Sequence, residues 1–148
     1  MQDYRNLRVW QKAHKLALAT YGISACLQKP EAWPLRDRAL RAAIPIPSNI
    51  AEGAGRGTDP DFRRFLWHSL GSCNELEYDL LLALELRFLS SEQHALLRQQ
   101  VEDVRRMLSG LVEVLTPSDA SRRGKSAEQE AGSGEQEADS RRRSHEGL

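Results

Sequence analysis

A row of basic side chains near the beginning of the chain is the feature most suited to binding chemistry. Its four members are spaced three or four residues apart: Arg5, Arg8, Lys12 and Lys15. On a helix, which turns about 100° per residue, they share an arc of about 80°. Such a row could bind the phosphates of RNA or DNA with little sequence preference, helped by Arg63 and Arg64. A solvated charged face explains the same row equally well.

Residues for catalysis or metal binding do not form a pattern that predicts an enzyme. No Glu precedes a His by three residues, so the di-metal motif of helical bundles is missing. Cys26 and Cys73 form no CxxC pair, and we expect both to be small apolar core residues. Ser69 and Ser72 lack a Gly-x-Ser-x-Gly elbow. We predict no enzymatic activity, no cofactor and no metal site.

Two polar residues fall on the edges of apolar helical faces, where unpaired burial costs about 1–3 kcal/mol each. These residues are Asn49 and Glu77. We expect them to satisfy one another in a structural polar layer, together with Arg41. Such a layer would set the register between helices rather than catalyse a reaction.

The first predicted helix, Tyr4 to Leu27, has more apolar surface than one core contact needs. One row follows three-and-four spacing: Val9, Ala13, Leu16, Thr20, Ile23 and Leu27. A second row beside it includes Trp10 and Tyr21, so the apolar arc exceeds the usual stripe of about 100°. We therefore predict that Trp10 and Tyr21 contact another subunit, with core packing inside the monomer as the alternative.

The second predicted helix runs from Leu35 to Gly53 and contains Pro45 and Pro47. Each proline removes a backbone hydrogen bond, so the helix must be kinked or split near Ile44. The glycine-rich run 53–57 ends it. This run could also be compared with a phosphate loop, but it lacks a Gly-Lys-Ser/Thr sequence, and an interhelical turn is the better interpretation.

Start and stop signals delimit two further helices. Thr58 or Asp59 before Pro60 begins the third, which extends to about Phe88. Ser90 with Gln93 forms a capping box that begins the fourth. Its apolar residues alternate in steps of three and four until Thr116-Pro117: His94, Leu97, Val101, Val104, Leu108, Leu111 and Leu115.

The sequence therefore predicts an all-α fold, an antiparallel four-helix bundle formed by residues 1–116. Residues 117–148 are polar and charged with almost no apolar side chains, which predicts a disordered tail. The chain has 21 basic and 21 acidic residues, so net charge favours no partner. No apolar run is long enough to cross a membrane, and we expect a cytoplasmic protein without a membrane partner.

Three segments together resemble a known bacterial family. They are Leu7 to Ala13, the segment Arg41 to Arg56 with its Asn-Ile-Ala-Glu-Gly run, and Phe65-Leu66 followed by Gly71 to Glu77. They are similar to the four-helix bundle proteins known as 23S rRNA intervening-sequence proteins. The accessory proteins of diversity-generating retroelements belong to the same group. The resemblance covers roughly residues 4–116.

The resemblance implies an up-and-down bundle that assembles as a homopentamer and has no enzymatic activity. In the retroelement branch, it implies a ring that binds nucleic acid and assists a reverse transcriptase. This chain departs from the pattern at Pro45, where serine is common, and residues 1–116 hold 15 basic and 14 acidic residues. Two functions therefore stay open: a nucleic-acid-binding accessory protein, or a protein-interaction scaffold that does not bind nucleic acid.

Overall fold

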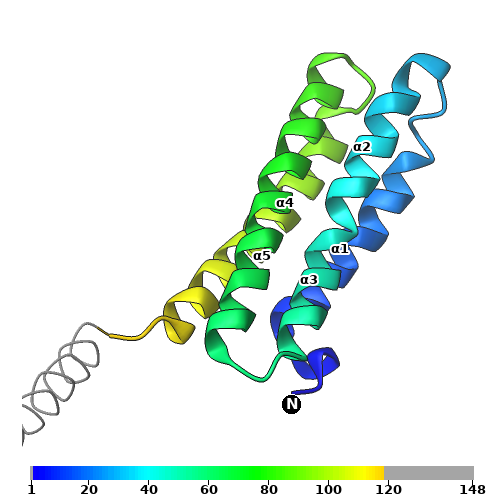
Figure 1. Ribbon diagram of the computed structural model, residues 1–148. Helices are drawn as coiled ribbons and strands as arrows, with labels where there is room; N and C mark the ends of the chain where they lie inside the picture. Colours follow the sequence, from blue (N-terminus) through cyan, green and yellow to red (C-terminus); the bar gives the residue numbers. More distant parts are fainter. Residues whose placement is uncertain (1, 119–148) are drawn as a thin grey trace, which may run out of the picture. The chain divides into compact units, whose positions relative to one another are not determined.

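Every regular element in residues 2–118, the part of the chain that the computed structural model describes, is helical (Figure 1). Five α-helices follow one another: α1 Arg8–Ser24, α2 Trp33–Ala43, α3 Pro45–Ala54, α4 Asp59–Glu85 and α5 Ser91–Leu115. Short 3-10 turns at Tyr4–Asn6 and Pro30–Ala32 precede α1 and α2. Because α3 continues the direction of α2, the five helices make four rods, and the all-α prediction is confirmed.

The chain enters α1 later than the sequence predicts. Tyr4–Asn6 is a separate 3-10 turn, and Leu7 is extended with φ −76° and ψ 123°. Asp3 caps this turn, because its side chain accepts a 3.0 Å hydrogen bond from the backbone N–H of Arg5. Arg5 therefore lies outside the register of α1.

The second rod is split at Ile44, as the two prolines predict. Pro45 and Pro47 stand at the beginning of α3, where a helix tolerates a residue without an N–H group. Ile44 keeps helical dihedrals, φ −60° and ψ −43°, and its N–H still bonds to the carbonyl of Leu40. The break therefore removes backbone hydrogen bonds between α2 and α3, but the chain continues in the same direction.

The ends of α4 and α5 follow the predicted capping signals. Thr58 accepts a hydrogen bond from the N–H of Asp61 at the start of α4. Ser90 and Gln93 form the predicted capping box, with bonds of 3.1 and 2.9 Å. At its other end α4 stops at Glu85, before the predicted Phe88, and Arg87 takes a left-handed φ of 62° in the turn to α5.

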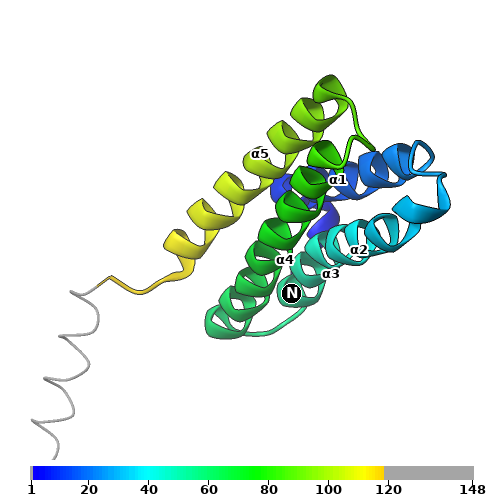
Figure 2. The same ribbon diagram turned by 90° about the horizontal axis from the view of Figure 1, so that it is seen from above.

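The rods run alternately up and down and pack around one core (Figure 1, Figure 2). Both α1 and α4 contact α5 and the α2–α3 rod, so α1 and α4 stand at opposite corners of the bundle. The largest fully buried side chains come from all four rods: Leu16, Ile46, Ile50, Leu66, Leu76, Leu97 and Leu108. This arrangement is the predicted antiparallel bundle.

The two cysteines have different environments. Cys73 is buried in the core of α4, as predicted, and burial raises the pKa of its thiol to about 12. Cys26 is exposed, so the prediction for it is wrong. The reason is that α1 ends at Ser24 and leaves Cys26 in the connection to α2.

The predicted disordered tail lies outside the described residues, apart from Pro117 and Ser118. The boundary between a domain at 1–116 and a tail at 117–148 therefore stays a prediction. Among residues 2–118, no helix is both long and apolar enough to cross a membrane.

Candidate functional site

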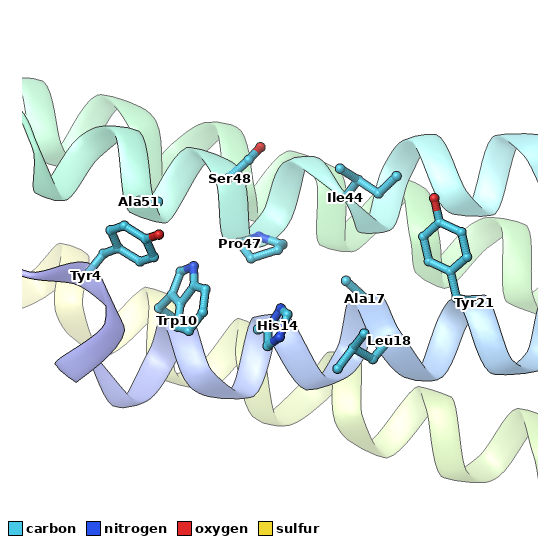
Figure 3. Close-up of a pocket in the computed structure, with 10 residues that line it drawn as sticks. All are labelled: Tyr4, Trp10, His14, Ala17, Leu18, Tyr21, Ile44, Pro47, Ser48 and Ala51. Atoms are coloured by element: carbon cyan, nitrogen blue, oxygen red, sulfur yellow. The ribbon is translucent and has the colours of Figure 1, made fainter.

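An apolar groove runs between α1 and α3 and encloses about 420 Å³ (Figure 3). Ten residues line it: Tyr4, Trp10, His14, Ala17, Leu18, Tyr21, Ile44, Pro47, Ser48 and Ala51. On the α1 side, Trp10, His14, Ala17 and Tyr21 follow heptad steps of four, three and four. This spacing places them in one row along the helix.

An aromatic cluster forms one end of the groove. The indole of Trp10 stacks on the imidazole of His14 one turn later, with ring centroids 4.9 Å apart and planes at 7°. Tyr4 meets the same indole edge-on, with centroids also 4.9 Å apart. The 3-10 turn that precedes α1 positions Tyr4 for this contact. The cluster is therefore a preformed aromatic wall opposite Pro47 and Ala51 of α3 (Figure 3).

The other end of the groove is open and apolar. Leu18, Tyr21 and Ile44 are 57%, 52% and 43% exposed there. Both residues predicted to contact another subunit, Trp10 and Tyr21, line this one groove. Tyr21 is exposed, whereas Trp10 is partly buried and also packs against the core of the monomer, which was the alternative prediction. Exposed apolar surface of this kind is typical of a binding interface, and its use as one stays a prediction.

The basic row of α1 lies on another side of the same helix. Arg8, Lys12 and Lys15 are exposed, and none of them has an ion-pair partner within residues 2–118. Lys12 and Lys15 border a small hollow with Gln100 and Asp103 of α5. Three of the four predicted residues therefore form a continuous row on α1, and two of them, Lys12 and Lys15, lie beside α5.

Arg5 does not belong to this row, and the predicted shared arc of four residues is wrong. Its guanidinium pairs with Asp3 at 3.2 Å, because the 3-10 turn takes it out of helical register. The backbone N–H and side chain of Arg5 also hold the pKa of Asp3 below its ordinary value.

Arg63 and Arg64 have partners close by. Arg63 Nη1 donates a 2.7 Å hydrogen bond to the carbonyl of Leu115, one of the last carbonyls of α5. Arg64 lies 3.7 Å from a carboxylate oxygen of Asp61 and 4.7 Å from the ring centroid of Phe65. Arg63 thus ties α4 to the end of α5, and neither side chain joins the α1 row.

The structure does not bring the predicted polar layer together. Asn49 Nδ2 donates a 2.9 Å hydrogen bond to the carbonyl of Pro45 in its own helix. Glu77 pairs instead with Arg105 of α5, and Arg41 is exposed. The prediction is wrong in its partners because Glu77 lies on the side of α4 that meets α5, away from α3.

Two other buried polar contacts join the second and third rods. Ser69 of α4 donates a 2.9 Å hydrogen bond to the carbonyl of Ile46 on α3. The second contact, between Arg38 and Asp79, is one that sequence reasoning missed. Asp79 of α4 is 2% exposed and accepts a 3.1 Å hydrogen bond from Nε of Arg38 on α2. Burial raises the pKa of Asp79, and Arg38 acts in the opposite direction. The signal was present, since Asp79 falls between the buried positions Leu76 and Ala83 at helical spacing.

Metal-ligating side chains do not gather within residues 2–118: no three of their His, Cys, Asp or Glu residues could hold one ion. Two surface features remain as candidates for binding: an apolar groove and, on another side of α1, a basic row.

Comparison with known proteins identifies a family and a solved structure with a similar fold. The sequence profile described as 23S rRNA-intervening sequence protein matches residues 5–110. A crystal structure from Bacteroides thetaiotaomicron, a protein with unknown function from the S23 ribosomal protein family, superposes with a TM-score of 0.67. It is 22% identical, and the match covers 70% of this chain and 97% of that chain, a likeness that shows the fold. No curated protein matches.

Proposed function

The chain belongs to the 23S rRNA-intervening sequence protein family, and from this premise we propose that it is a non-enzymatic, self-assembling module that binds nucleic acid. Several copies form a homo-oligomeric ring, a pentamer as the sequence resemblance implies. The ring binds RNA or DNA through the basic side chains of α1.

The observation that supports nucleic-acid binding best is the row formed by Arg8, Lys12 and Lys15. Their charges have no ion-pair partners within residues 2–118, so they are available for phosphates. Three cations bind a polyanion weakly, because each neutralised phosphate adds only one counterion-release step. A ring repeats the row in every subunit and thereby strengthens binding without any new contact.

The apolar groove supports self-assembly. It places Trp10 and Tyr21 on one partly exposed surface, and large aromatic side chains are enriched at subunit interfaces. The resemblance to retroelement accessory proteins extends the proposal to a partner. In that role the ring presents nucleic acid to a reverse transcriptase that copies it.

Fluorescence anisotropy with a labelled single-stranded RNA, and with DNA of the same sequence, tests the binding. We expect the logarithm of the association constant to fall linearly with the logarithm of salt concentration. The double variant Lys12→Glu/Lys15→Glu should lose at least about tenfold in affinity at low salt, because it reverses two phosphate contacts in every subunit.

A matched variant controls for net charge. Lys29→Glu/Arg98→Glu makes the same charge change at two exposed residues outside the row, and it should bind nearly as the unchanged chain does. Equal losses in the two double variants, or binding that does not respond to salt, would refute the α1 site. Light scattering on the same samples tests assembly, and a monomer at micromolar concentration would refute the ring.

A protein-interaction scaffold without nucleic-acid binding is the second candidate. It is favoured by the charge balance and by the local partners of Arg5, Arg63 and Arg64. On this alternative the basic row serves solubility. No binding in the anisotropy titration, together with an intact oligomer, would select it.

A further inference from the structure

The outer face of α4 carries a second apolar surface, which nothing in the bundle covers. Five exposed residues follow heptad steps of four, three, four and three: Trp67, Gly71, Asn74, Tyr78 and Leu81. The side chains of Trp67, Tyr78 and Leu81 are 59%, 56% and 42% exposed. We call these five residues the α4 stripe.

The α4 stripe is unusual for a helix that already has a core face. Leu66, Cys73, Leu76 and Leu80 bury the opposite side of α4 in the bundle. The side that faces solvent is normally polar in such a helix. Trp67 also borders a shallow hollow toward α3 and another toward α5, so it stands on a ridge. The stripe has three large apolar side chains at coiled-coil spacing, Trp67 at one end and Tyr78 with Leu81 at the other, and Gly71 and Asn74 lie between them. Such a face is suited to contact a further helical surface.

The groove between α1 and α3 has the complementary shape. Its α1 row repeats with the same heptad steps, and three of its lining side chains are small: Ala17, Ser48 and Ala51. Two helices with a furrow between them accept a third helix whose large side chains enter that furrow. The groove is thus concave, and Trp67 of the α4 stripe projects between two hollows.

Charges at the two surfaces are also complementary. Arg41 extends the groove wall one turn before Ile44, and it is exposed. Glu85 extends the α4 stripe one turn after Leu81, and Glu75 flanks its middle. None of these three side chains has an ion-pair partner in the described residues 2–118. The positive charge of Arg41 beside the groove can therefore pair with the negative charges of Glu75 or Glu85 beside the stripe of another copy.

We propose that the α4 stripe of one copy docks into the α1–α3 groove of the next copy. This inference rests on the proposed self-assembly and names the surfaces that produce it. Since α1 and α4 stand at opposite corners of the bundle, one copy cannot fill its own groove. Contact between two different surfaces is heterologous, and repetition of such a contact closes a ring when the rotation allows.

Two single variants and their mixture test the pairing by light scattering at micromolar concentration. Leu18→Glu damages only the groove, and Trp67→Glu damages only the stripe; both side chains are more than half exposed, so the fold should tolerate the change. We expect each variant alone to be monomeric. An equimolar mixture should stop at a dimer, because one intact groove meets one intact stripe and no further surface remains.

Val114→Glu is the matched control, since Val114 is an exposed apolar residue of α5, and it should keep the full assembly mass. The proposed docking is wrong if the wild-type chain assembles and either variant keeps the mass of the wild-type assembly. It is also wrong if the mixture of the two variants stays monomeric. Loss of RNA binding by Trp67→Glu without loss of assembly would overturn it too, and would assign the stripe to nucleic acid. A monomeric wild-type chain would refute the self-assembly itself.

Cross-linking gives a second readout that does not depend on lost stability. With Cys26 replaced by Ser, mild oxidation of a Ser48→Cys chain mixed with a Gly71→Cys chain should produce a disulfide-linked dimer. A Cβ at Gly71 meets nothing within 4 Å, so this substitution is sterically free. Each chain alone, and Ser48→Cys mixed with Leu96→Cys, should not form the dimer. Equal cross-linking by Ser48→Cys alone would overturn the proposal in favour of groove-to-groove contact.

Discussion

Arg38 on α2 and Asp79 on α4, 41 residues apart in sequence, form an ion pair that joins two rods of the bundle. The Asp79 side chain is 2% exposed, whereas that of Arg38 is 57% exposed. The carboxylate is therefore inside the bundle and the guanidinium reaches it from the surface. This contact links α2 to α4 ahead of the groove residues that follow α2 in the chain.

We predict that Arg38→Ala lowers the free energy of unfolding by about 2 kcal/mol, because it leaves the buried Asp79 carboxylate without its partner. Because Arg38 is partly exposed, this loss of stability should stay below the about 3–5 kcal/mol that breaking a fully buried ion pair costs. Urea denaturation followed by circular dichroism measures it. Arg36→Ala is the control, since Arg36 forms a surface ion pair with its neighbour Asp37 and lies over the exposed Trp33 ring, and its loss should cost under about 1 kcal/mol. Equal losses would contradict a special role for the buried pair.

The titration of Asp79 should appear in the pH dependence of stability. Burial raises its pKa above the ordinary value of 3.8, although Arg38 opposes the shift. Between the unfolded and the raised folded pKa, the folded chain binds more protons, so the contribution of Asp79 to stability falls as pH rises. Asp79→Asn removes this titration. We expect the stability of the variant relative to the wild-type chain to increase as pH rises from 3.8 through the pKa of folded Asp79. Above that pKa the difference in stability should stay constant.

Denaturation curves recorded in steps between about pH 3 and about pH 7 cover this window. The quantity to plot is the unfolding free energy of Asp79→Asn minus that of the wild-type chain. A difference that stays flat, or falls with rising pH, would contradict the raised pKa.

Gly53→Ala should destabilise the bundle by about 1–3 kcal/mol, because α3 and α4 approach too closely there for a side chain. An added Cβ would lie 2.7 Å from Cδ2 of Phe62 and 2.9 Å from Cβ of Phe65. Gly22→Ala and Gly110→Ala are controls in helices where a Cβ meets nothing within 4 Å. Both should be neutral or stabilising by up to about 1 kcal/mol. Thermal melts of the three variants separate close packing from general helix propensity.

The pairing of Glu77 should show in double-mutant cycles. We predict a coupling of about 1 kcal/mol between Glu77→Gln and Arg105→Met, because their side chains meet between α4 and α5. The cycle between Glu77→Gln and Asn49→Ala should give a coupling near zero, since Asn49 bonds within α3. A larger coupling for the Asn49 pair would restore the layer predicted from sequence.

Local signals predicted the elements of this fold well. Ser90 with Gln93, Thr58 before Pro60, and the prolines beside Ile44 act through hydrogen bonds only a few residues away. Their effect can therefore be predicted from the local sequence. Helix ends without such signals were predicted less well, since α1 ends at Ser24 and α4 at Glu85. Arg5 was misplaced too, because the 3-10 turn at Tyr4–Asn6 interrupts the helical spacing that the basic row assumed.

Tertiary structure alone decided which surfaces are exposed and which polar groups meet. Helical spacing identified Trp10 and Tyr21 as an additional apolar row, but only the packing of α1 against α3 made that row one wall of a groove. The partners Arg38 with Asp79, and Glu77 with Arg105, depend on the rotation and height of separate helices. Periodicity determines the face of a helix, whereas its neighbours are determined by the packing of all four rods together.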